Sequence, residues 1–317
     1  AAFTDQNKYG DCKALSNYMK TILKCVGIKS YVGIINSEYN AVAVDPSFPC
    51  NNFNHVILCI PQKTDSIWLE CTSSTIEFGT LSTFTENRNA LLITDDGGVL
   101  VPTPVSKSDY NTIHTSTEIL MDTDLSGKGQ TLISAKGSYH DIIIEILKEK
   151  RDEQKDYIIN GLGFKQPDDF EITSNNSLKN TIQLKLEVSK IPEFNAGNKY
   201  FIKQRLNKIW TARLPSASKR KMDYFFRFPF EKTDTTVIHL PKGFALEVLP
   251  SEKNIKSNYS SYTSKSWYNK EQNAVYTITK LVLLKHRIPA LDYASVKSFF
   301  DEVLQDDAQR IVINKME

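Results

Sequence analysis

The chain has 317 residues, enough for two domains, and its 39 basic and 37 acidic residues leave a net charge of +2, which argues against a dedicated nucleic-acid-binding protein. Hydrophobic residues make up 40% of the chain and charged residues 24%, as in globular proteins. No run approaches the roughly 18 apolar residues that a membrane helix needs.

The first predicted element is a turn, Tyr9-Gly10-Asp11-Cys12-Lys13, that leads into an amphipathic helix. Apolar residues recur there with a spacing near 3.6, and Gly27 predicts the end of the helix. Asp11 is the expected N-cap, because its carboxylate can accept from the unpaired amides of the first turn. The positive end of the helix dipole favours the nucleophilic thiolate of Cys12. A lone cysteine is otherwise most often a small buried residue.

Three short strands are predicted after this helix, at residues 30–35, 54–60 and 66–71. An irregular segment, residues 36–52, separates the first strand from the second. It contains two prolines and an Asn-Asn pair, and it leads directly into the second strand. Loops beside a reactive group often shape substrate access, although a simple connection is the alternative.

The last two of these strands predict a hairpin that brings a histidine to a carboxylate. If Ile60 pairs with Asp65, His55 lies directly opposite Glu70, with their Cβ atoms about 4.5–5.5 Å apart. A carboxylate beside a histidine orients the ring and keeps it basic. The sequence therefore offers Cys12 as a nucleophile, His55 as a base and Glu70 as the acid that orients it.

The five cysteines all lie in the first quarter of the chain, at Cys12, Cys25, Cys50, Cys59 and Cys71. No two of them form a Cys-x-x-Cys pair, so we expect neither a zinc site nor any other metal or cofactor. The spacing does not decide whether a disulfide joins two of the last four.

A domain boundary is predicted near residue 106, after the Pro-rich stretch 101–104, which indicates an extended linker. The first domain is then residues 1–105 and the second residues 106–317. The second domain is predicted to be a mainly antiparallel β-sandwich. Its expected features are a hairpin at 111–122 and 129–137, a helical insertion near 140–165, an alternating strand at 181–188 and a helix near 291–304.

A basic run, Ser218-Lys219-Arg220-Lys221, precedes the aromatic run Tyr224-Phe225-Phe226. Basic residues next to aromatic residues can bind single-stranded nucleic acid. The rest of the chain supplies no matching basic surface, so we interpret the pair as a charged turn that enters a core strand.

The three motifs of the first domain resemble those of the transglutaminase-like cysteine-protease superfamily. They are Gly10-Asp11-Cys12-Lys13, Phe53-Asn54-His55-Val56 and Trp68-Leu69-Glu70-Cys71-Thr72. The resemblance is to a bacterial branch, common in Bacteroidetes, in which such a domain lies between two β-rich domains. Residues 240–244, 248–250 and 289–299 are similar, more loosely, to the C-terminal domain of that architecture.

The resemblance implies an α+β fold with a papain-like transglutaminase core followed by the β-rich domain. It implies that Cys12 is the nucleophile, His55 the general base and Glu70 the orienting acid, a position where the family usually has Asp. It also implies a periplasmic or cell-envelope location. The family's N-terminal β-rich domain is missing from this chain, and we expect it to pack against the first domain.

These residues predict acyl transfer from an amide through a thioester on a protein or peptide substrate. Transfer to water gives a peptidase or amidase, and transfer to an amine gives a transglutaminase-type cross-link. We favour hydrolysis, because water is always present. Gln6 is a candidate oxyanion-hole residue, since it precedes Cys12 by six residues, as in papain-like enzymes. Two alternatives remain, a catalytically silent cell-envelope binding or scaffold module and a structural interaction protein that acts mainly through its β-rich domain.

Overall fold

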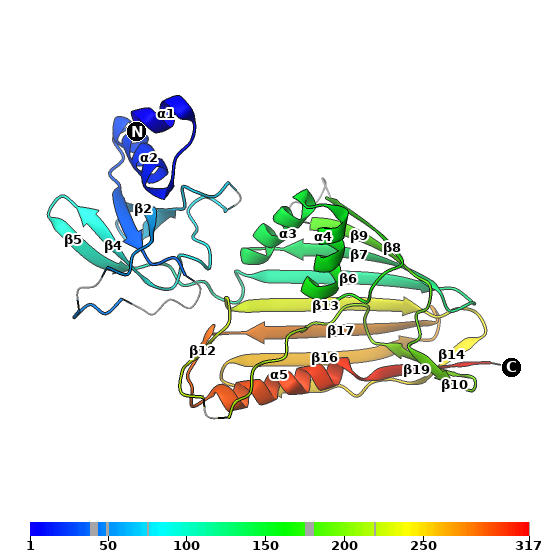
Figure 1. Ribbon diagram of the computed structural model, residues 1–317. Helices are drawn as coiled ribbons and strands as arrows, with labels where there is room; N and C mark the ends of the chain where they lie inside the picture. Colours follow the sequence, from blue (N-terminus) through cyan, green and yellow to red (C-terminus); the bar gives the residue numbers. More distant parts are fainter. Residues whose placement is uncertain (39–43, 49–50, 75, 175–180, 219, 317) are drawn as a thin grey trace. The chain divides into compact units, whose positions relative to one another are not determined.

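A computed structural model describes the chain except for residues 39–43, 49–50, 75, 175–180, 219 and 317 (Figure 1). The chain divides into two compact units, Ala1–Ser106 and Lys107–Glu317. Both combine helices with mainly antiparallel sheets, so the predicted α+β class is confirmed. In the part of the chain that the structure describes, no helix is both long and apolar enough to span a bilayer.

The first unit is a five-stranded antiparallel sheet with the strand order β3-β2-β1-β4-β5, together with two helices. Its elements are α1 (Ala2–Asn7), α2 (Cys12–Cys25), β1 (Tyr31–Ile35), β2 (His55–Pro61), β3 (Ser66–Leu69), β4 (Asn89–Thr94) and β5 (Gly97–Pro102). The predicted helix and the three predicted strands are thus α2, β1, β2 and β3.

Local signals set both ends of α2. The Asp11 carboxylate accepts from the backbone N–H of Ala14 at 2.8 Å, which confirms the predicted N-cap. At the other end Gly27 has a φ of +76°, a conformation that glycine adopts without a steric penalty. The N–H of Ile28 then donates to the Leu23 carbonyl, and that of Gly27 to the Lys24 carbonyl. These two bonds form a Schellman cap.

The two faces of the first sheet pack against different partners. Met19 and Leu23 of α2 cover the face that carries Leu58, Ile60 and Leu69. Strand alternation turns the side chains between these positions to the opposite face. There Ile57, Cys59 and Trp68 form a second cluster, with Ile35, Leu81, Ala90 and Leu92.

The second unit contains three α-helices, a short π-helix and fourteen strands within its described residues. They are β6 (Thr112–Met121), β7 (Gly127–Ala135), α3 (Ser138–Lys148), α4 (Arg151–Asp156), a π-helix (Tyr157–Gly161), β8 (Asp169–Ser174), β9 (Thr181–Val188), β10 (Phe194–Ala196), β11 (Lys199–Lys203), β12 (Tyr224–Phe225), β13 (Phe230–His239), β14 (Phe244–Val248), β15 (Lys253–Lys256), β16 (Ser260–Asn269), β17 (Ala274–Leu283), β18 (Arg287–Ile288), α5 (Tyr293–Asp307) and β19 (Arg310–Lys315). The predicted hairpin, helical insertion, alternating strand and last helix are all present.

An eight-stranded sheet with the order β15-β16-β17-β13-β6-β7-β9-β8 organises this unit. It is antiparallel except for β6 and β13, which pair in parallel. The prediction of a β-sandwich needs correction, because the second sheet (β10-β11-β19-β14) covers only part of one face. Helices α3 and α5 cover other parts of that face (Figure 1). A full second sheet is not needed to bury this face, because α3 and α5 each pack an apolar side against the strands.

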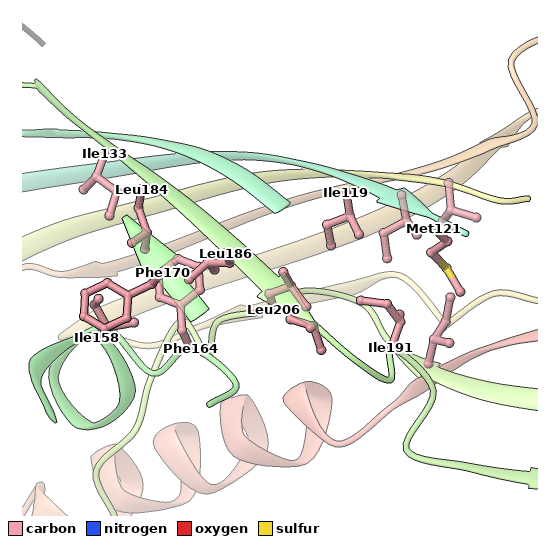
Figure 2. Close-up of a cluster of buried hydrophobic side chains, with 14 of the residues drawn as sticks. Ile119, Met121, Ile133, Ile158, Phe164, Phe170, Leu184, Leu186, Ile191 and Leu206 are labelled. Carbon is pink, nitrogen blue, oxygen red and sulfur yellow. The ribbon is translucent and has the colours of Figure 1, made fainter. Parts of the chain in front are cut away.

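The covered face contains two hydrophobic clusters. One joins β6, β7 and β9 to α3, the π-helix and the four-stranded sheet, and Figure 2 shows its side chains gathered below the strands, among them Leu184, Leu186, Phe164 and Phe170. The other packs α5 and buried residues of the segments 209–214 and 226–230 against β16 and β17. Phe226 is buried in this second cluster and Arg220 lies over the Tyr224 ring, an arrangement that agrees with a charged turn that enters the core.

Two rows of buried polar side chains cross the same face of the large sheet. By register, one row is Ser264, Thr279, Asp234 and Thr115, and the next is Ser266, Thr277, Thr236, Thr117 and Thr131. All of them except Ser266 are less than 9% exposed. Hydrogen bonds within and between the rows satisfy these groups, for example from Thr115 and Thr236 to the Asp234 carboxylate.

Leu184 and Leu291 form a matched pair of leucines for testing this core. Leu184 is fully buried, whereas Leu291 is 97% exposed. We expect Leu184→Ala to lower the free energy of unfolding of the second unit by about 2–5 kcal/mol through the cavity that it leaves. Leu291→Ala should change it by less than about 0.5 kcal/mol. Hydrogen exchange in β9, measured over a series of urea concentrations, gives the free energy of unfolding of both variants. Equal decreases in this free energy would contradict the packing.

Candidate active site

Cys12 is the first residue of α2 and is partly buried. The turn before it requires glycine, because a Cβ at position 10 would lie only 2.7 Å from the Cβ of Ala14. Asp11 caps the helix directly before the thiol. The Gly-Asp-Cys motif therefore places a cysteine in the first turn of a helix, where the unpaired amides and the dipole favour negative charge.

Ser16 shows which part of the sheet the start of α2 approaches. Its hydroxyl is buried and donates to the backbone carbonyl of Val56 at 3.3 Å. Cys12 precedes Ser16 by one turn, about 6 Å along the helix axis. Further along the helix, Met19 and Leu23 pack beside Leu58 and Ile60, so α2 and β2 run in the same direction. Cys12 therefore lies at the end of the sheet where β2 begins with His55.

His55 and Glu70 form a buried polar contact in the first unit. The Nε2 atom of His55 lies 3.0 Å from both carboxylate oxygens of Glu70. Their side chains are 13% and 5% exposed, so water competes little for this bond. With its proton on Nε2 the ring donates to the carboxylate, and Nδ1 is left to exchange protons with another group.

The register of the hairpin differs from the prediction by two residues. Ile60 pairs with Ile67, not with Asp65, and Pro61 pairs with Ser66. Pro61 ends the strand, where its missing N–H costs no ladder bond, and the turn follows at Gln62–Asp65. An even shift leaves His55 and Glu70 on one face as diagonal neighbours, a separation that a long side chain spans. The longer Glu side chain suits this diagonal.

Two groups hold the Glu70 carboxylate. The Thr72 hydroxyl donates to Oε1 at 2.6 Å and the Thr72 N–H donates to the same oxygen at 3.3 Å. Burial alone would raise the pKa of Glu70, but the hydrogen bonds from His55 and Thr72 outweigh burial, and the pKa lies below its usual 4.5. Glu70 is therefore ionised at neutral pH and fixes the orientation of the His55 ring.

The structure does not join all three predicted residues. Among the described residues, no hydrogen bond links the Cys12 thiol to His55. Alternation places His55 with Ile57 and Glu70 with Trp68, on the face opposite the one that α2 covers. Only the first turn of α2 reaches the end of the sheet where His55 lies. Gln6 is exposed in α1, and nothing in its surroundings tests its predicted role.

The other described cysteines lie in environments unlike that of Cys12. Cys25 is exposed at the opposite end of the same helix, and Cys59 and Cys71 are free thiols in the sheet region. Burial raises the pKa of the Cys59 and Cys71 thiols. Cys50 lies outside the described residues, so the question of a disulfide at that position stays open.

Sequence reasoning missed Phe84, which lies beside this pair, and Arg88, which holds the segment around Phe84. The Phe84 ring approaches His55 edge-on, with centroids 6.3 Å apart. Arg88 anchors the same segment by donating to four backbone carbonyls, those of Asn36, Glu38, Thr83 and Glu86. Both residues lie in or beside an irregular segment, where no periodicity predicts which side chains face the site. Thr72 was visible in the third motif, but only the fold shows that it holds Glu70.

Residues 198–313 match a family described as a domain of unknown function with solved-structure structure, DUF3858. The chain is similar to a crystal structure of a "putative protease" from Parabacteroides distasonis, with 13% identity and a TM-score of 0.49. That match covers 99% of this chain and 45% of the other, so the chain spans less than half of its length. A match to baculovirus P35 has 8% identity and a TM-score of 0.13, and covers 67% of this chain and 97% of the other. No curated protein matches the chain.

Glu70→Gln tests how far the ion pair stabilises the first unit. Because the native pKa of Glu70 is lowered, its ionised form stabilises the fold above pH 4.5, and this contribution is lost as the pH falls through the native value. At pH 7 we expect the substitution to lower the protection of β2 and β3 by about 1–3 kcal/mol.

Hydrogen exchange in the peptide that covers residues 55–71 measures this effect. The difference between wild type and Glu70→Gln should shrink at pH 3.5. Glu247→Gln, which removes a carboxylate from the second unit, serves as the control. A loss that is independent of pH would contradict a stabilising role of the ionised carboxylate.

Proposed function

We propose that the first unit catalyses acyl transfer from an amide with Cys12 as the nucleophile, and that it acts as a peptidase or amidase. The buried bond between His55 and Glu70 carries this proposal. A histidine whose Nε2 is held by an ionised carboxylate is suited to exchange protons at Nδ1. The cysteine in the first turn of a helix, at the same end of the sheet, supplies a nucleophile within the same region.

In the proposed reaction the Cys12 thiolate attacks the carbonyl carbon of the substrate amide, and a C–S bond forms. The C–N bond then breaks as His55 gives its Nδ1 proton to the leaving amine, and a thioester remains. Water attacks the thioester while His55 takes its proton, and the thiolate leaves. Glu70 keeps the ring in one orientation throughout. The N–H of Cys12 is a donor for the oxyanion, and Gln6 is the second candidate.

The reaction requires the thiol and Nδ1 to meet at the start of β2. Catalytic hydrogen bonds are often long in a protein without substrate and tighten only in the complex. The rest of α2 is packed through Ser16, Met19 and Leu23, so we place any closure at its first turn. Substrate binding at this end of the sheet is the expected cause of that closure.

We extend the proposal to a protein or peptide substrate and to a periplasmic or cell-envelope location. The family's N-terminal β-rich domain is the proposed partner of the first unit. An amine in place of water would make the same site a cross-linking enzyme, and cross-linking to a primary amine would distinguish the two. These extensions are carried by the motifs around Cys12, His55 and Glu70.

Alkylation by iodoacetamide tests the nucleophile, with Cys25 as an internal control at the opposite end of α2. At pH 7 we expect Cys12 to react at least about tenfold faster than Cys25, because Cys12 lies at the N-terminus of α2 and Cys25 at its C-terminus. Cys59 and Cys71 should react more slowly still, since burial raises the pKa of each thiol. Peptide mass spectrometry gives the rates.

Acyl-enzyme formation from p-nitrophenyl acetate provides the second measurement of this prediction. We expect an acetyl adduct on Cys12, its loss in Cys12→Ala and its retention in Cys25→Ala. Glu70→Gln should slow adduct formation at least about tenfold, whereas the exposed Glu38→Gln should not. Slow, uniform labelling of all five thiols, or an adduct that persists in Cys12→Ala, would favour the silent binding module.

A further inference from the structure

A lysine lies on the covered face of the large sheet, where apolar and hydroxyl side chains are the rule. Lys232 is in β13, between the buried residues Phe230 and Asp234 on the same face. Its cross-strand neighbours are Ile113 and Leu281, both buried. Lys232 as a whole residue is only partly buried, unlike its neighbours on this face.

Three aromatic rings surround the amine. Its Nζ atom lies 5.7 Å from the ring centroids of Tyr139 and Trp210 and 5.6 Å from that of Phe230. These rings come from α3, from the segment before β12 and from β13, and Trp210 stacks on Phe230. We call these three residues and Lys232 the aromatic box.

No counter-ion balances this amine among the residues that the structure describes. No carboxylate lies within 4.0 Å of Lys232, and none of the hydrogen bonds involves its Nζ. Asp234, the nearest carboxyl group along the face, is bonded to Thr115 and Thr236, and burial raises its pKa. Glu231 points to the other face, where it pairs with Lys280.

The remaining titratable groups that face the box give no negative charge either. Burial raises the pKa of Tyr139 in the box and of Tyr262 on β16, so both phenols stay neutral. Arg205, which lies near Asp234, pairs with Asp307. The Nε1 atom of Trp210 is buried without a hydrogen-bond partner. The box therefore contains no acceptor for the indole N–H.

An ammonium group is poorly accommodated here. Removing it from water costs more free energy than cation–π attraction to the rings returns. The neutral amine loses far less, and burial accordingly lowers the pKa of Lys232 to about 8. About one amine in ten is then neutral at pH 7, against about one in 2,500 for an ordinary lysine.

We propose that Lys232 is a nucleophilic amine and a site of acylation by activated acyl donors such as thioesters and active esters. The neutral amine attacks the acyl carbon, a C–N bond forms, and the bond from the acyl group to its leaving group breaks. The proton released from nitrogen goes to solvent. The product is a neutral amide, which suits an apolar box better than an ammonium and brings a carbonyl acceptor into it.

Limited acetylation of the folded wild-type protein with sulfosuccinimidyl acetate tests this proposal. Lys280 is the matched control, because it lies on the neighbouring strand and is 47% exposed. At pH 7 we expect Lys232 to be acetylated about tenfold faster than Lys280, with a rate that levels off above pH 8 while that of Lys280 still rises. Peptide mass spectrometry gives both rates. An acetylation rate equal to or below that of Lys280 would overturn the proposal.

Trp210→Leu provides an independent variant. Loss of this ring admits water to the amine, so we expect the rate at Lys232 to fall toward that of Lys280, while Trp267→Leu on the same unit leaves it unchanged. An unchanged rate in folded Trp210→Leu would show that the box does not activate the amine. If that variant fails to fold, the pH profile of the wild-type protein decides the question alone.

Discussion

The candidate site depends on the register between β2 and β3. His55 and Glu70 can meet only if both side chains lie on the same face of the sheet. Strand alternation allows this when the two residues pair directly or when the register is shifted by an even number of residues. The observed pairing meets this condition with a diagonal contact. The longer Glu side chain spans the diagonal, and both of its carboxylate oxygens lie 3.0 Å from Nε2. A shift of one residue would turn Glu70 toward α2 and leave the imidazole without its acid.

The same alternation sets the limit of the site. It turns His55 away from the face that α2 covers, so the helix contributes only its first turn. The motif Gly10-Asp11-Cys12 concentrates several constraints at that turn: a close approach to Ala14, a capped N-terminus and a thiol. These constraints fix the position of the Cys12 backbone at the start of α2.

Local signals in the sequence predicted the elements well, and long-range pairing escaped them. The Asp11 cap, the Gly27 stop and the alternation in β9 each follow from neighbouring residues, and the structure contains all three. The hairpin register depended on whether Pro61 ends a strand or begins a turn, and the sequence favours neither. The parallel pairing of β6 with β13 joins strands over a hundred residues apart, and Phe84 and Lys232 gain their surroundings only from such contacts.

The polar rows across the large sheet have a consequence for how its strands find their places. Inside–outside alternation penalises a slip of one residue but not a slip of two, which returns every side chain to its own face. A two-residue slip between β13 and β17 would set Asp234 against Leu281 or Thr277 in place of Thr279. The hydroxyl rows would then no longer line up across five strands. The hydroxyl rows therefore give the observed strand register a lower free energy than registers shifted by two residues.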